Sequence, residues 1–224
     1  MIAPAPATRI VTPRGKTLAW DDTDRLWLLR AIEAEGEPRD LVAQTLVNRW
    51  AWLWDETPGK YIKLVELVRA YAQPVNPAWY PDGKLFLGQL AKLPEAQRAQ
   101  AVLRANARRD VHSTRTQFSP RTVVAVDTAL RGPVSIPPGA LHFAATSIDR
   151  PDLPVLVPAE SDRHNVIYGE AGSRGARARY VVRSATAEPP PPAPSSSSTA
   201  ARIAAVVGIV ALGIGVGIGA AHLK

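Results

Sequence analysis

Glu33 is the residue whose type and position best suit acid–base chemistry. It lies seven residues after Leu26 and four after Leu29, so it extends the apolar face of a helix. A carboxyl group in that position loses hydration, and this loss raises its pKa. The position therefore predicts a general acid that keeps its proton near neutral pH. The alternative is a half-exposed carboxylate at a helix end that takes no part in catalysis.

Two more glutamates follow closely. Glu35 is expected to project from another face of the same helix, which Gly36 should end. Glu37 lies near the start of the next helix, where a negative charge interacts favourably with the helix dipole. Glu37 is therefore predicted either to cap that helix or, near Glu33, to contact a substrate.

The stretch 71–80 combines side-chain amides with aromatic rings on a loop stiffened by prolines. Amides bond sugar hydroxyls and N-acetyl groups, and aromatic faces stack on pyranose rings. Gln73, Asn76 and Trp79 are therefore predicted substrate contacts, as is Gln117 further along the chain. The alternative for Trp79 is that it anchors the loop to the core.

No cofactor or metal is expected. The chain has no cysteine, which excludes disulfides, thiolate metal sites and cysteine nucleophiles. His112, His142 and His164 lack the close spacing of a zinc site. A serine hydrolase is disfavoured because the chain has no G-x-S-x-G turn.

The region from residue 20 to about 180 holds every tryptophan, tyrosine and phenylalanine, so the core is expected there. Apolar spacing predicts a mainly α domain with a small irregular or β portion at its C-terminal end. A helix capped by Asp22 or Thr23 is expected to run to Gly36. Further helices are expected from Pro38 through Trp50, near 61–72, at 94–108 and from Ser119-Pro120 to Leu130. Strands are expected at 141–144, 155–157 and 180–182.

The segments on either side of this domain differ from it in composition. Residues 1–19 are rich in proline and alanine and are expected to be flexible. Residues 184–200 are a predicted Pro/Ser-rich linker. Residues 203–221, within a predicted anchor segment 201–224, are uncharged and would span about 28 Å as a helix, which predicts one transmembrane anchor. Its G-x-x-x-G pairs would permit a homo-oligomer, unless they serve only for insertion.

The chain carries 27 Lys and Arg against 20 Asp and Glu, a net charge of +7. This excess favours polyanionic partners such as nucleic acid, anionic lipid or cell-wall polymer. Residues 181–224 account for +2, so the remaining charge is expected to be spread over the globular part. Because no basic arm or zinc finger is present, no specific nucleic acid is expected, and a basic membrane-tethered nucleic-acid binder is the weakest hypothesis.

The sequence motifs around Glu33 resemble those of the SleB-type cell wall hydrolases, the spore-cortex-lytic family. Glu33-Ala34-Glu35-Gly36-Glu37-Pro38, followed by Asn48-Arg49, is similar to its E-A-x-G-E-P…A…NR signature. Later motifs that look similar to those of the family are Gln117-Phe118-Ser119, Gly139-Ala140-Leu141-His142-Phe143 and, more weakly, His164-Asn165-Val166-Ile167-Tyr168. The resemblance covers roughly residues 24–170. The chain departs from the family at Glu35, where Arg is common, and at Ile32, where a small residue is usual.

The resemblance implies a lysozyme-like transglycosylase domain over residues 20–183. It would cleave the β-1,4 bond between N-acetylmuramic acid and N-acetylglucosamine in peptidoglycan, with Glu33 as the single catalytic acid/base. Glu37 and His142 would lie among the substrate contacts. A non-catalytic wall-binding or virion structural protein that keeps the fold is the alternative, and the departure at Glu35 favours it.

Location is the remaining expectation. The N-terminal residues contain no apolar run of signal-peptide length, and Arg183 and Arg202 precede the predicted anchor while only Lys224 follows it. The positive-inside tendency would keep the domain on the cytoplasmic side, although peptidoglycan lies outside. A phage protein, either in a virion membrane or released at lysis through the host inner membrane, would resolve this conflict.

Overall fold

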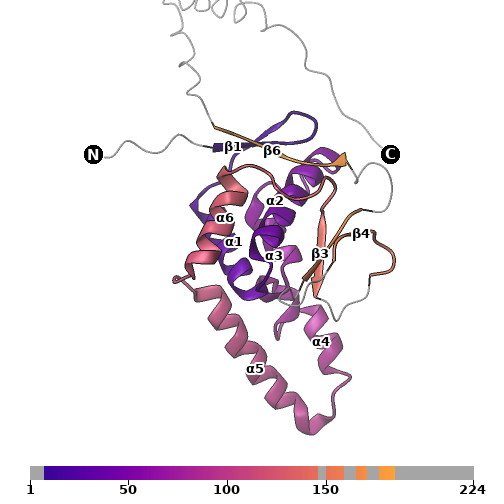
Figure 1. The fold of residues 1–224 in the computed structure, drawn as a ribbon. Coiled ribbons are helices and arrows are strands. Elements are labelled where there is room, and N and C mark those ends of the chain that lie inside the picture. The colour runs from indigo at the N-terminus through magenta and orange to yellow at the C-terminus, as the bar shows by residue number, and fades with distance from the viewer. Residues whose placement is uncertain (1–7, 146–149, 159–164, 171–176, 185–224) are drawn as a thin grey trace, which may run out of the picture. The chain divides into compact units, whose positions relative to one another are not determined.

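The protein is described by a computed structural model that covers residues 8–145, 150–158, 165–170 and 177–184. These residues belong to one compact unit, in which six α-helices predominate (Figure 1). The helices are α1 (Asp22–Glu35), α2 (Arg39–Glu56), α3 (Leu64–Tyr71), α4 (Lys84–Leu90), α5 (Glu95–Thr114) and α6 (Pro120–Arg131). The expected mainly α class is confirmed, and α4 is an additional helix.

Helix α1 begins one residue earlier than expected. Asp21, rather than Asp22 or Thr23, is the N-cap, and its carboxylate accepts a hydrogen bond from the backbone N of Asp24. The Asp24 carboxylate bonds back to Asp21 N and also accepts a bond from Val65 N, at the start of α3. One buried carboxylate therefore fixes the starts of two helices, which sets the direction in which α1 carries Glu33.

Helix α2 is the centre of the core and contacts α1, α3, α6 and the strand residues 142–145 and 165–168. It starts at Arg39 because Pro38, expected in its first turn, is its N-cap instead. Trp50 is fully buried, while Trp52 and Trp54 are half-buried and pack against the core.

Helices α4 and α5 form a hairpin that projects from the other helices (Figure 1). The hairpin, residues 84–114, carries six basic against two acidic side chains. More than half of the net charge of +7 is therefore on this hairpin. The expectation that positive charge is spread over the globular part is wrong, because it is concentrated where no core packing opposes it.

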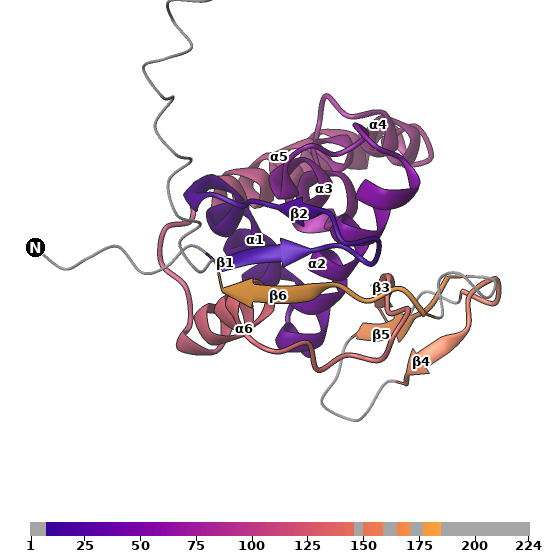
Figure 2. The ribbon, with the colours of Figure 1, turned by 90° about the horizontal axis from the view of Figure 1, so that it is seen from above.

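Two small antiparallel sheets complete the unit. One contains β1 (Thr8–Val11), β2 (Thr17–Leu18) and β6 (Val181–Ser184) in the order β2-β1-β6. The other contains β3 (His142–Ala145), β4 (Val155–Val157) and β5 (Asn165–Tyr168) in the order β3-β5-β4. Figure 2 shows the first sheet lying across one end of the helices, and α6 contacts both β1 and β6.

The N-terminal part of the chain differs from its expected flexibility. Ile10 of β1 is fully buried opposite Val182 of β6, so residues 8–11 and 17–18 belong to the folded unit. Within the described part of the chain, no helix is both long and apolar enough to cross a membrane. The predicted linker, apart from Ser184, and the predicted anchor at 203–221 lie outside the described residues.

Candidate functional site

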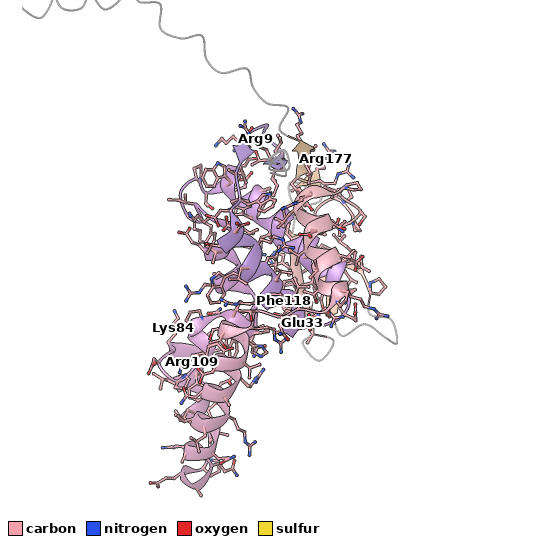
Figure 3. The ribbon with its side chains drawn as sticks, turned by 90° about the vertical axis from the view of Figure 1, so that its left-hand side faces the viewer. Arg9, Glu33, Lys84, Arg109, Phe118 and Arg177 are labelled. Atoms are coloured by element: carbon pink, nitrogen blue, oxygen red, sulfur yellow. The ribbon has the colours of Figure 1, made fainter. Side chains whose placement is uncertain are left out.

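Glu33 lies in the last turn of α1, where the end of that helix meets the start of α6. Its Oε2 accepts hydrogen bonds from the backbone N of Ser119 at 3.1 Å and from Ser119 Oγ at 2.9 Å. Arg115 Nη1 lies 3.7 Å from Oε1. Figure 3 shows Glu33 and Phe118 at the level where the α4–α5 hairpin leaves the other helices. The sequence motifs that contain Glu33 and Ser119 are therefore in direct contact.

The expected rise in the pKa of Glu33 is wrong. Burial does raise the pKa of this carboxyl, but hydrogen bonds from Thr122 and Ser119 and the charge of Arg39 outweigh burial, so the pKa is lowered. Donors that bond to the ionised form stabilise it. In the ligand-free site Glu33 is therefore a well-stabilised carboxylate.

Glu35 has the electrostatics that were expected of Glu33. Burial raises the pKa of Glu35 to about 7, against a smaller opposing effect of a hydrogen bond from the Gln73 backbone. The two carboxyl groups lie two residues apart on one helix, so they project from different faces of it. Glu33 is engaged with the start of α6, whereas Glu35 is near the short 3-10 helix η1 (Gln73–Val75).

Glu37 is held at the start of α2. It forms an ion pair with Arg39 and also accepts a hydrogen bond from the Arg39 backbone N at 3.2 Å. This arrangement matches the capping alternative. Glu37 also lines a cavity of about 520 Å³ between α2 and α6, together with Gln44, Pro120 and Ser135. Substrate contact by Glu37 stays a prediction.

His142 joins a polar network inside the domain. Its ring bonds Arg49 of α2 on one side and Glu170 on the other, where Nε2 lies 2.7 Å from the carboxylate. Burial lowers the pKa of His142, the charge of Arg49 lowers it further, and Glu170 opposes this. The Arg49 guanidinium also lies 3.9 Å above the Tyr71 ring. His142 is therefore a ring positioned by its neighbours, and substrate contact by His142 stays a prediction.

Two asparagine side chains connect the sequence motifs by hydrogen bonds to backbone groups. Asn48 is fully buried and donates to the carbonyls of Ala140 and Ala178, while its side-chain oxygen accepts a bond from Tyr180 N. Asn165 in β5 donates at 3.3 Å to the backbone oxygens of both Glu35 and Glu37. The turn between α1 and α2 is thus attached to the second sheet.

The three predicted contacts in the loop at 71–80 have different surroundings. Asn76 uses its amide within the loop, donating to Ala70 O at 2.7 Å and accepting from Ala78 N at 2.9 Å. It caps the short 3-10 helix η2 (Pro77–Trp79), so part of the hydrogen-bonding capacity of its amide is used within the loop, and substrate contact by Asn76 stays a prediction. Gln73 and Trp79 line a cavity of about 240 Å³ against the hairpin.

Gln117 is exposed, between two residues that contact Glu33. The structure therefore brings Gln117 and Glu33 into one region and places Gln73 near Glu35, while His142 and Asn76 serve internal contacts. Among the described residues no group of three acidic or histidine side chains is arranged to hold a metal ion. His164 lies outside the described residues.

Sequence reasoning missed three partners in this region: Arg115, Arg49 and Glu170. Arg49 carried a usable signal, since a charged residue at a core-facing helix position needs a buried partner. Arg115 and Glu170 lie in irregular segments without periodicity. Only their tertiary contacts identify them.

The comparisons with known proteins leave the family open. No protein-family model matches the chain, and the searches of curated proteins and of solved structures find no match.

Proposed function

We propose that the chain is a peptidoglycan-degrading enzyme that cleaves the β-1,4 bond between N-acetylmuramic acid and N-acetylglucosamine as a lytic transglycosylase, with Glu33 as its acid/base. One observation carries the proposal. The motifs that resemble those of the SleB-type hydrolases are separated by up to 130 residues, and they are joined by hydrogen bonds in this fold. Ser119 bonds Glu33, Arg49 bonds His142, and Asn165 bonds the turn that follows Glu33.

The proposed chemistry needs one carboxyl group. Protonated Glu33 would donate its proton to the glycosidic oxygen as the bond from that oxygen to C1 of the muramyl residue breaks. The resulting carboxylate would then take the proton of the muramyl 6-hydroxyl, whose oxygen attacks C1. A 1,6-anhydro ring closes, no water is consumed, and Glu33 regains its proton.

The lowered pKa of Glu33 places a condition on this chemistry. Glu33 is ionised in the free site at neutral pH, so the reactive form must be favoured when substrate is bound. A glycan strand that covers the end of α1 would exclude water from the carboxylate, and desolvation raises a carboxyl pKa. The acid would therefore form mainly in the substrate complex.

Zymography on peptidoglycan tests the proposal. The full chain in mild detergent is compared with Glu33→Gln and with the matched control Glu95→Gln, an exposed glutamate on α5. We expect clearing by the wild type and Glu95→Gln, and a loss of about 100-fold or more in Glu33→Gln, the usual effect of losing a general acid. Mass spectrometry should detect anhydro-muramyl ends. Equal clearing by all three proteins, or none by the wild type, contradicts the proposal.

A non-catalytic wall-binding or virion structural protein is the second candidate. The observation that favours it is the position of Glu33, which acts as an acceptor at the N-terminus of α6 in the way a structural helix contact does. Under this alternative, the wild type and Glu33→Gln would cosediment equally with wall sacculi and release no soluble fragments.

The proposal includes attachment to a bilayer through residues 203–221 and an association with a phage. The attachment rests on the uncharged sequence of these residues. Flotation of the full chain with lipid vesicles, compared with a chain that ends at residue 200, tests the attachment. Flotation of both chains with the vesicles in equal amounts would contradict it.

A further inference from the structure

A cavity of about 240 Å³ lies between the α4–α5 hairpin and the loop that contains η1 and η2. Trp79 and Tyr80 line it from the loop, Phe86 from α4, and Arg104 and Arg108 from α5. The volume is below the roughly 300 Å³ at which pockets for drug-sized ligands begin. The cavity therefore has the size for one small ring.

The two arginines of this cavity are available to a ligand. Arg104 and Arg108 are four residues apart, so they lie on one face of α5. Both are exposed, and neither forms an ion pair or a side-chain hydrogen bond with any residue that the structure describes. Two other hairpin arginines are engaged: Arg98 bonds Leu93 O, and Arg109 pairs with Asp110.

The cavity has a positive potential. Burial raises the pKa of Tyr80, and the charges of Arg108 and Arg109 oppose that rise, as a nearby positive charge should. Burial lowers the pKa of His112 on the same helix, and Arg115 and Arg108 lower it further. A group on the loop and a group on α5 therefore both respond to the positive charge of Arg108, which would attract an anion.

We infer that this cavity binds a pyranose ring that bears a carboxylate. Arg104 and Arg108 would bond the carboxylate, since guanidinium groups match its geometry. The aromatic side chains of Trp79 and Phe86 would contact the apolar face of the ring. Gln73 connects the cavity to the C-terminal end of α1, because it lines the cavity and its backbone bonds the Glu35 carboxyl, two residues from Glu33.

This inference deepens the proposed function, on which it rests. The two sugars of peptidoglycan differ in the lactyl carboxylate of N-acetylmuramic acid, which N-acetylglucosamine lacks. A subsite that selects the acidic sugar would fix the register of the glycan strand relative to Glu33. The net charge of the hairpin would serve the same partner, by drawing an anionic polymer toward the cavity.

Binding of two soluble disaccharides tests the inference. N-acetylglucosaminyl-β-1,4-N-acetylmuramic acid carries the carboxylate but not the bond that Glu33 is proposed to cleave, and di-N-acetylchitobiose is its neutral counterpart. The full chain in mild detergent is titrated with each, and the indole N–H resonance of Trp79 is followed by NMR. We expect the acidic disaccharide to bind about tenfold more tightly, a difference typical of one charge-assisted hydrogen bond. The Trp79 resonance should shift on binding.

The variants separate the cavity from general charge effects. Arg104→Gln combined with Arg108→Gln should abolish the preference for the acidic disaccharide. Lys92→Gln, an exposed position outside the cavity, removes a charge from the same hairpin and should keep the preference. Circular dichroism confirms that each variant is folded.

Two kinds of result overturn the inference. One is equal affinity of the wild type for both disaccharides, or a preference that survives the double substitution. The other is tighter binding of inorganic phosphate or a single-stranded oligonucleotide at Trp79, which would make the site one for phosphate groups. Failure of the proposed function is distinguishable, because clearing without sugar preference contradicts only the inference, and preference without clearing contradicts only the function.

Discussion

Ser119 donates both its backbone N–H and its hydroxyl to the same carboxylate oxygen of Glu33, across 86 residues of sequence. The same hydroxyl oxygen accepts the Thr122 backbone N–H and so caps α6. One serine therefore caps α6 and is, with Thr122 and Arg39, one of the residues that lower the pKa of the candidate catalytic acid. Local structure and proposed chemistry depend on the same side chain.

Replacing Ser119 with alanine should affect both properties. Loss of the cap should lower the free energy of unfolding by about 1 kcal/mol, measured by urea denaturation. Loss of the hydroxyl donor should raise the pKa of Glu33, because one bond to the ionised form disappears. The carboxyl carbon resonance of Glu33, followed by NMR against pH, measures that shift. Ser113→Ala, which removes a hydroxyl bonded to Arg109 O within α5, is the control and should leave the Glu33 titration unchanged.

The pH profile of peptidoglycan cleavage should depend on the kinetic constant that is measured. The free protein must bind a proton at Glu33 before it can react, so kcat/KM should fall as pH rises through the lowered pKa of this group. The fall in kcat should occur at higher pH, since bound substrate removes water from the carboxylate. Initial rates on soluble glycan strands provide both profiles. If kcat/KM and kcat fell over the same pH range, the result would contradict the role of substrate in burying the carboxylate.

Glu35 should make the domain less stable as pH rises. Its pKa is about 7 in the folded protein and near the ordinary value of 4.5 when unfolded, so between these values only the folded state holds the proton. Stability present at low pH is therefore lost as pH rises through this window, by on the order of 3 kcal/mol in total. Urea denaturation at several pH values measures it. Glu35→Gln should remove this part of the slope, whereas Glu95→Gln should keep it.

Asn48→Ala should strongly destabilise the domain. The substitution leaves the carbonyl of Ala140 and the N–H of Tyr180 without their buried partner, while the Ala178 carbonyl keeps its bond from Gly139 N. Each unsatisfied buried group costs about 1–3 kcal/mol, so we expect a loss of about 3 kcal/mol or more. Gln100→Ala, an exposed amide on α5, should change stability by less than about 0.5 kcal/mol. Similar urea midpoints for both variants would show that Asn48 is not structurally important.

The sequence by itself determined the elements whose causes are local. The Ser119-Pro120 start and Gly132 end of α6 follow from capping and turn chemistry within a few residues, and the structure has them there. The helical spacing around Trp50 likewise predicted the central helix α2. The strand pieces near 142, 155 and 181 were also predictable from their short apolar runs.

The tertiary structure alone decided the electrostatics of the site. Spacing showed that Glu33 follows an apolar face, but its pKa depends on donors that arrive from Ser119 and Thr122, far along the chain. The tertiary structure also decided strand β1. Residues 8–11 give no strand signal in the sequence, and they form a strand by pairing with β6. Capping and periodicity act over a few residues, whereas desolvation and charge depend on which distant segments pack together, and a single sequence does not encode that locally.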